Sequence, residues 1–328
     1  MPQPQKLARW LFIVAGLVFA IVVVGGLTRL TESGLSITEW KPVSGALPPL
    51  SDAAWQQAYA DYLRVPQAQT VHAGITMGQF KFIFFWEWVH RLLGRVIGLA
   101  LLLPLIWYWI KGAIPQGYKP RLLALVALVG LQGAVGWWMV TSGLLQGEHV
   151  SHIRLSIHLI IALSIMAGLV WTALDLRSGR NARLQPIAIV AGLVLAVQLT
   201  LGAWVAGMRA GYVASDWPLM QGKVFPDGVE WGSGLAALAT DPYLVHFTHR
   251  WWAFVTLFAL IMLERRAKAM GGKSAARAVA AVGGTQILLG IATVMTGISL
   301  PLAVLHQANG ALLVAATAWC AHVVGRRA

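Results

Sequence analysis

Residues 10–27 read WLFIVAGLVFAIVVVGGL, a run without a single charged side chain. Its length is close to the roughly 20 apolar residues that an α-helix needs to cross the hydrocarbon core of a bilayer. The run follows Lys6 and Arg9 and has no small-residue cleavage site, which favours a first membrane span over a cleavable leader. The environment of this chain is therefore predicted to be a membrane.

The composition extends that prediction to the whole chain. Of 328 residues, 58% are hydrophobic and 11% are charged, whereas a soluble domain carries about a quarter charged residues. We expect an all-α polytopic membrane protein with eight transmembrane helices, at 10–27, 82–110, 122–144, 152–174, 187–208, 244–263, 278–298 and 302–322. The two long connections, 28–81 and 209–243, are rich in Gly, Pro and Trp. The single cysteine, Cys320, excludes an intrachain disulfide.

The basic residues predict the orientation. A net charge of +13 can indicate nucleic-acid binding, but we reject nucleic acid as a partner because these cations lie in short loops between apolar stretches. Six Lys and Arg fall on one side of the predicted spans, and fifteen fall on the side of the two termini: Lys6, Arg9, Lys111, Lys119, Arg121, Arg177, Arg180, Arg183, Arg265, Arg266, Lys268, Lys273, Arg277, Arg326 and Arg327. This bias predicts a multi-pass protein of the inner membrane with both termini cytoplasmic.

The second half of the chain repeats motifs of the first. The offset between matched positions shrinks from 177 to 159, 154 and 148 along the chain, in the pairs Gly25/Gly202, Gly34/Gly211, Glu39/Asp216, Trp40/Trp217, His90/His249, Gln132/Gln286, Gly136/Gly290, Gly143/Gly297 and His158/His306. We therefore expect two pseudo-symmetric four-helix bundles, residues 1–180 and 181–328, related by an axis along the membrane normal. A duplication without shared chemistry is the simpler alternative.

Four of the nine histidines favour shared chemistry. His90 and His158 are predicted at similar depth on spans two and four, and His249 and His306 repeat them on spans six and eight. Two imidazoles at one depth can bind a flat metal macrocycle from both faces, and imidazole is a common axial ligand of haem. The alternatives are hydrogen-bonded buried histidines and, less favoured, zinc. Of the remaining histidines, His72 is predicted in a loop and His149, His152 and His322 at the membrane edges, while His246 lies three residues before His249 and its part in ligation is left open.

Glu87 distinguishes the two halves. It precedes His90 by three residues on the same helix face, within an aromatic run, whereas the equivalent residue of the second half is His246. A lone carboxyl among aromatic side chains favours its protonated form and can exchange protons near neutrality. The alternative is an ion pair with Arg91 or Arg95. The sequence therefore predicts that one site carries out a reaction that the other site assists.

The arginines within the spans leave two interpretations open. Arg91, Arg95 and Arg250 can pair with haem propionates, because guanidinium groups bind carboxylates in a fork. They can equally bind backbone carbonyls or neighbouring carboxyl groups. The pairs Trp137-Trp138 and Trp251-Trp252 similarly suit either the interfacial aromatic belt or the lining of a haem pocket.

These motifs resemble those of the haem A synthase family. The similarity covers nearly the whole chain and is most specific in EWVHR at 87–91, followed by Gly94-Arg95, with weaker matches in HFTHR at 246–250, LHQ at 305–307, GLS at 34–36 and EWKP at 39–42. The resemblance implies that the substrate haem O binds to His90 and His158, that a haem b cofactor binds to His249 and His306, and that Glu87 is the catalytic acid. The reaction oxidises one methyl group of haem O to the formyl group of haem A, for terminal oxidases.

One feature departs from many members of that family. They carry a cysteine pair in the first outer loop, whereas 28–81 and 209–243 contain none, so the chain is similar to the cysteine-lacking class of proteobacteria and mitochondria. Besides haem O and lipid, candidate partners are haem O synthase, an oxidase assembly factor, an unidentified electron partner and a second copy of the chain. The alternatives to a synthase are a di-haem b electron-transfer protein and a haem transporter or chaperone, neither of which accounts for Glu87 in one half only.

Overall fold

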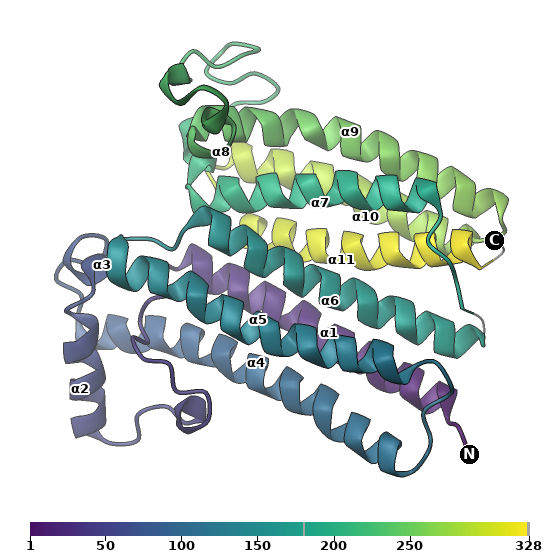
Figure 1. The fold of residues 1–328 in the computed structure, drawn as a ribbon. Coiled ribbons are helices and arrows are strands. Elements are labelled where there is room, and N and C mark those ends of the chain that lie inside the picture. The colour runs from purple at the N-terminus through teal and green to yellow at the C-terminus, as the bar shows by residue number, and fades with distance from the viewer. Residues whose placement is uncertain (180, 327–328) are drawn as a thin grey trace.

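The structure is a computed structural model that describes residues 1–179 and 181–326, and within them it contains helices and no named strand. Arg180 and Arg327, both counted in the charge bias, lie outside the described residues, as does the end of the predicted first half. Eight of the described helices are long and apolar enough to cross a membrane, which confirms the predicted number (Figure 1): α1 (Pro4–Leu30), α4 (Met77–Ile110), α5 (Lys119–Gln146), α6 (His152–Ser178), α7 (Pro186–Gly207), α9 (Pro242–Ala269), α10 (Lys273–Met295) and α11 (Leu300–Gly325).

Most of these helices extend the predicted spans by a few residues at each end. The predicted span 278–298 is wrong at its end, because α10 stops at Met295. Gly297 and Ile298 have φ angles of 62° and 64°. This left-handed conformation cannot continue a right-handed helix, so it turns the chain toward α11.

Local sequence explains where several helices begin. Proline occupies the first turn of α1, α5, α7, α9 and α11, where its missing N–H group costs no hydrogen bond. Thr76 and Gln79 form a capping box at the start of α4, and the Asp241 side chain accepts a hydrogen bond from the Leu244 amide at the start of α9. These caps set the depth at which the histidine-bearing helices enter the bundle.

The two long connections contain short helices that the sequence analysis did not predict. The first connection holds η1 (Ser44–Ala46), α2 (Asp52–Tyr62) and α3 (Pro66–Gln69), and the second holds η2 (Ala210–Val213), η3 (Trp231–Ala236) and α8 (Ala237–Thr240). Tyr62 and Phe80 are both fully buried in a small core between the first connection and α4. The connection 28–81 is therefore a packed structure rather than an extended linker.

The long helices form two groups of four. In Figure 1, α1, α4, α5 and α6 lie together in the lower part, and α7, α9, α10 and α11 lie above them. Helix α11 contacts α1 and α6 of the other group, and one continuous hydrophobic core includes residues of both groups. Both termini lie at the same end of the molecule, opposite the end that carries α2, α3 and α8.

A buried polar cluster joins the two groups near the terminal end. His322 of α11 lies 2.9 Å from Asp175 of α6 through its Nε2 atom, and Arg121 of α5 lies 2.5 Å from the other carboxylate oxygen. His322 lies in the last turn of α11 and is 1% exposed, so its side chain is buried within the protein. The reason is that Asp175 gives this imidazole a polar partner inside the protein.

Candidate functional site

The first pair of predicted histidines meets inside the first group of helices. His90 on α4 and His158 on α6 face each other, with ring centroids 6.5 Å apart and planes inclined by 55°. Metal–nitrogen bonds to imidazole are about 2 Å long, so two imidazoles on opposite sides of one metal place their ring centroids roughly 6 Å apart. The observed spacing therefore fits axial ligation of one metal ion by both rings.

Each of these rings rests on a glycine of a neighbouring helix. A Cβ atom on Gly25 of α1 would lie 3.1 Å from Nε2 of His90, and one on Gly136 of α5 would lie 2.9 Å from Cε1 of His158. Such separations are too short for ordinary contacts between carbon and ring atoms. Glycine at these two positions is what allows the rings to occupy the centre of the bundle.

The second pair is built in the same way. His249 of α9 rests on Gly202 of α7, and His306 of α11 rests on Gly290 of α10; a Cβ atom on either glycine would lie 3.0 Å from the Cε1 atom of its ring. The glycine pairs Gly25/Gly202 and Gly136/Gly290 are the same pairs that the sequence repeat matches. In both histidine pairs, each imidazole therefore packs against a glycine of a neighbouring helix.

Glutamine side chains precede three of these glycines by one helical turn. The amide groups of Gln132 and Gln198 donate to the backbone carbonyls of His158 and His249 at 2.9 and 3.1 Å, and Gln286 lies 3.4 Å from Nε2 of His306. The sequence analysis missed Gln198, because the matching residue of the first half is the apolar Ile21. The threefold Gln-x-x-x-Gly spacing was the signal that could have identified it.

The free ring nitrogens fit a metal macrocycle. The Nδ1 atoms of His158 and His306 are buried without a hydrogen-bond partner in the described structure, as are those of His246 and His322, and no hydrogen bond of the His90 ring is found among the described residues. Buried imidazoles normally have all polar atoms paired. The residues that are present therefore fit a pair of bis-histidine haem sites. Clusters of three or more His, Cys, Asp or Glu residues suited to a metal ion are absent from the described residues, which gives zinc no support.

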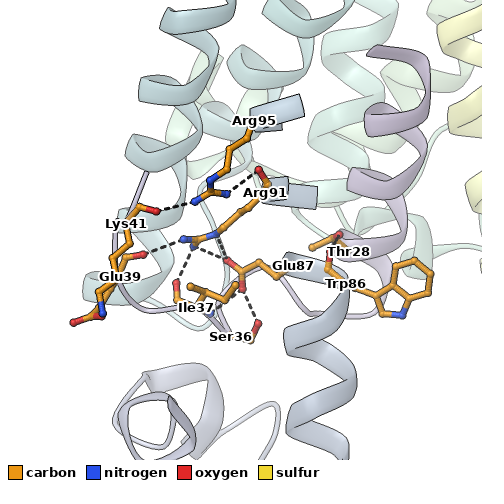
Figure 2. A network of polar contacts seen from close by, with 9 residues as sticks. All are labelled: Thr28, Ser36, Ile37, Glu39, Lys41, Trp86, Glu87, Arg91 and Arg95. Atoms are coloured by element: carbon orange, nitrogen blue, oxygen red, sulfur yellow. Dashed lines mark hydrogen bonds and ion pairs between the residues drawn. The ribbon is translucent and has the colours of Figure 1, made fainter. Parts of the chain in front are cut away.

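Glu87, three residues before His90 on α4, lies at the centre of a polar network (Figure 2). It is 3% exposed. Its Oε1 atom accepts hydrogen bonds from Nε and NH2 of Arg91 at 3.1 and 2.6 Å. Its Oε2 atom accepts from the Ser36 hydroxyl at 2.7 Å and from the Ile37 amide at 2.9 Å. The expectation of a lone carboxyl among aromatic rings is wrong, because residues of the outer loop and Arg91 surround it with donors.

The second half has a similar contact between an arginine and the residue one helical turn before it. The Nε atom of Arg250 donates to Nε2 of His246 at 3.0 Å, as Arg91 does to Glu87. His246 therefore serves as the partner of Arg250. His246 precedes Arg250 by four residues, just as Glu87 precedes Arg91, so the residues of each pair face each other across one helical turn. His246 thus has the structural role toward Arg250 that the Glu87 carboxylate has toward Arg91.

The backbone contacts of the two arginines match as well. Arg91 donates to the carbonyls of Ile37 and Glu39, and Arg250 donates to those of Ala214 and Asp216, 177 residues later. Arg95 donates to the carbonyls of Lys41, Pro42 and Arg91. The sequence left two interpretations of these arginines open, binding to haem propionates or binding to backbone carbonyls and carboxyl groups. The structure shows the second. This binding stabilises irregular loop backbone next to membrane-spanning helices.

The other candidates lie outside the two histidine pairs. His72 contacts Tyr62 in the outer loop, His149 approaches Glu32, and His152 lies 2.8 Å from the Ala239 carbonyl. Trp137 packs on Trp40 with ring centroids 5.3 Å apart. Trp138 and Trp251 are each 44% exposed, as expected for an interfacial belt.

Comparison with known sequences agrees with this arrangement. The sequence model of the cytochrome oxidase assembly protein family matches residues 8–318. The chain belongs to this family. Among curated members, the heme A synthase of Novosphingobium aromaticivorans is 55% identical over 98% of this chain and 95% of its own length. The heme A synthases of Sphingopyxis alaskensis and Caulobacter vibrioides are 53% and 48% identical, over 99% and 97% of this chain and 94% and 96% of their own lengths.

This member of the cytochrome oxidase assembly protein family has no thiol in its outer loops. Its one cysteine, Cys320, is free and buried on α11. A reaction route through outer-loop thiols is therefore not available to the residues of this chain.

Proposed function

We propose that this protein is a haem A synthase, an oxidoreductase that converts a methyl group of haem O to the formyl group of haem A. The observation that carries the proposal is the near-full-length similarity to curated heme A synthases at 48–55% identity. The facing pair His90 and His158 beside the buried Glu87 supplies a matching site. The similarity does not favour a di-haem electron-transfer protein or a haem transporter.

We assign the two sites different roles. His90 and His158, in the half formed by residues 1–180, hold the substrate haem O. His249 and His306, in residues 181–328, hold haem b, which when bound would supply one-electron redox chemistry. The assignment is supported by the carboxylate, which is present beside the first pair and replaced by His246 beside the second.

Glu87 is the proposed catalytic residue. When the methyl group becomes a formyl group, hydrogens leave the carbon as protons while an external acceptor takes the electrons and the oxygen comes from water or dioxygen; a carboxylate within one helical turn of His90 can accept such a proton. The Ser36 hydroxyl donates a hydrogen bond to the same carboxylate at 2.7 Å. Ser36 belongs to the connection 28–81, so a proton on Glu87 could pass through this hydroxyl toward that connection. Arg91 holds the carboxylate in place through two of its nitrogens.

The orientation follows from the charge bias of the loops. We propose that the protein lies in the inner membrane with both termini in the cytoplasm and with α2, α3 and α8 on the outer side. Alkaline phosphatase fused after Arg326 should then be inactive, and the same fusion within 209–243 should be active. The reverse pattern would rule out this orientation. Haem O synthase, an oxidase assembly factor and homo-oligomer formation stay predictions.

The function is tested by supplying the substrate. Cells that make haem O and lack a haem A synthase should express this protein, and the haems of the purified protein should be extracted and separated by chromatography. We expect haem b together with haem O and haem A. The variant His158→Ala should retain haem b and contain little haem A, because one of the two proposed ligands of haem O is missing. Haem b alone in the wild-type protein would contradict the proposal.

A further inference from the structure

Arg154 differs from the other arginines within the membrane-spanning helices. Arg91, Arg95 and Arg250 each use all three side-chain nitrogens in hydrogen bonds, mostly to backbone carbonyls. Arg154 uses only NH1, which donates to the Trp138 carbonyl at 2.7 Å and approaches the Thr141 hydroxyl at 3.4 Å. Its Nε and NH2 atoms have no hydrogen-bond partner among the described residues, and no carboxylate there forms an ion pair with it. Arg154 is the third residue of α6 and is partly exposed, so these two donors are open to an incoming ligand.

The position of Arg154 relates it to the first histidine pair. It lies on α6 four residues before His158, which is about one helical turn toward the outer end. Its guanidinium lies over the Trp138 ring, 4.7 Å from the centroid. Trp138 follows Gly136, the residue on which the His158 ring rests, by two positions. Arg154 therefore stands on the side of α6 that faces α5, just outside the level of the imidazoles.

The surroundings provide space for a ligand group. Thr141, which Arg154 approaches, and Trp137 line a cavity of about 300 Å³ between α5 and the outer loop, together with Thr38, Asp61 and Arg64. Arg64 lies 3.7 Å from Asp61, and its side chain is largely exposed. Arg154 does not itself line this cavity but approaches it through Thr141, and unlike Arg64 it has no carboxylate partner among the described residues.

Only the first half has such a cation. The offset of 148 residues that relates His158 to His306 relates Arg154 to Leu302. This difference falls in the same half as Glu87, the half to which we assign the substrate. The second half, assigned to a permanently bound cofactor, has an apolar side chain at the equivalent position.

We propose that Arg154 binds a propionate carboxylate of haem O through its free Nε and NH2 atoms. The inference rests on the proposed function, because it takes the first half as the substrate site. Guanidinium and carboxylate form two parallel charge-assisted hydrogen bonds. Arg154 is then a positioning residue: by holding one edge of the macrocycle toward the outer side, it fixes the rotation about the axis between His90 and His158, and with it the ring methyl group that faces Glu87.

The test compares haem O with haem O dimethyl ester, in which the propionates carry no charge. Both are titrated into the purified wild-type protein and into Arg154→Leu, which introduces the residue found at position 302. For haem O we expect Kd to rise about tenfold or more in the variant, and for the ester we expect equal Kd values in the two proteins. Haem b, measured by extraction, should be unchanged and reports that the fold is intact.

Control variants separate the interpretations. Lys81→Leu removes another cation that lies over a tryptophan ring in the same half, 5.0 Å from the centroid of Trp55, and should leave both Kd values unchanged. Arg154→Lys keeps the charge without the fork and should weaken haem O binding a few-fold, with no effect on the ester. If Arg154→Leu does not accumulate in the membrane, the comparison of Kd values is made with Arg154→Lys instead.

Each outcome decides the inference. Equal haem O affinity in the wild type and the Arg154 variants would overturn it while leaving the proposed function intact, provided that the wild type makes haem A. An equal loss for haem O and its ester would also overturn it, because Arg154 would then act through packing or through a lipid phosphate. If the wild type binds no haem O, the proposed function fails, and the inference fails with it.

Discussion

Glu32 and Arg209 form an ion pair between the two groups of helices, with 3.7 Å between Oε1 of Glu32 and Nε of Arg209. The two residues are 177 positions apart, the same offset that separates Gly25 from Gly202. Both have left-handed backbone, with φ angles of 53° and 58°, directly after α1 and α7. Positions separated by the offset of the sequence repeat thus contact each other across the two groups of helices.

The Glu32 cluster should stabilise the association of the two halves. Glu32 also lies 3.3 Å from Arg29 and 3.4 Å from His149. Glu32→Ala would leave Arg29 and Arg209 without their shared anion, so we expect a loss of about 1 kcal/mol or more in the free energy of unfolding. Thermal unfolding of the purified protein in detergent measures it. The exposed Glu39, paired with Lys41, is the control: Glu39→Ala should leave Tm unchanged, and equal Tm values for both variants would contradict the account.

The second histidine pair should retain haem b through both rings. His249→Ala and His306→Ala should each abolish the tightly held, low-spin haem b while the protein still inserts into the membrane. His246→Gln is the matched control on the same helix, because His246 contacts Arg250 and is not a proposed ligand, and it should keep haem b. Absorption spectra and haem extraction provide the measurement. A full haem b spectrum in both alanine variants would show that the cofactor site is elsewhere.

The glycines under the rings should be needed for haem retention. Gly202→Ala adds a Cβ atom 3.0 Å from Cε1 of His249, so the ring has to shift. Overpacking of this kind costs about 1–3 kcal/mol, which corresponds to haem b affinity lowered about tenfold or more. Gly192→Ala, on the same helix but with nothing within 4 Å of the new atom, is the control and should bind as the wild type does. Equal haem b content in the two variants would argue against the glycine contact.

The outer loop of the first half should lose stability in acid. Burial lowers the pKa of His72 below its ordinary value of 6.5, although Glu32 opposes the shift, and its Nδ1 atom lies 2.6 Å from the Tyr62 hydroxyl. The unfolded state therefore binds this proton more readily than the folded state, so the stabilisation is present above about pH 6.5 and is lost as the pH falls below it. We expect the difference in Tm between the wild type and His72→Gln to shrink from pH 7.5 to pH 5. A constant difference would exclude this titration.

The sequence predicted the parts of the fold that depend on the membrane and on the repeat. Long apolar runs determine the spans, and matched histidines on matched spans indicated the pairing of His90 with His158. The surroundings of Glu87 were not predictable from local patterns, because its partners Ser36 and Ile37 lie about fifty residues away in an irregular loop. The short helix α2 was missed for a related reason: its packing partner, Phe80, belongs to another segment.

The most direct measurement of the central claim compares wild type with Glu87→Gln in cells that supply haem O. Glutamine keeps the size of the side chain and removes the group that exchanges protons. Haems extracted from the purified variant should contain haem b and haem O or a partly oxidised form, with haem A reduced at least about a hundredfold, in line with the contribution of a general acid or base. Haem A at the wild-type level in Glu87→Gln would contradict the claim that this carboxylate takes part in the reaction.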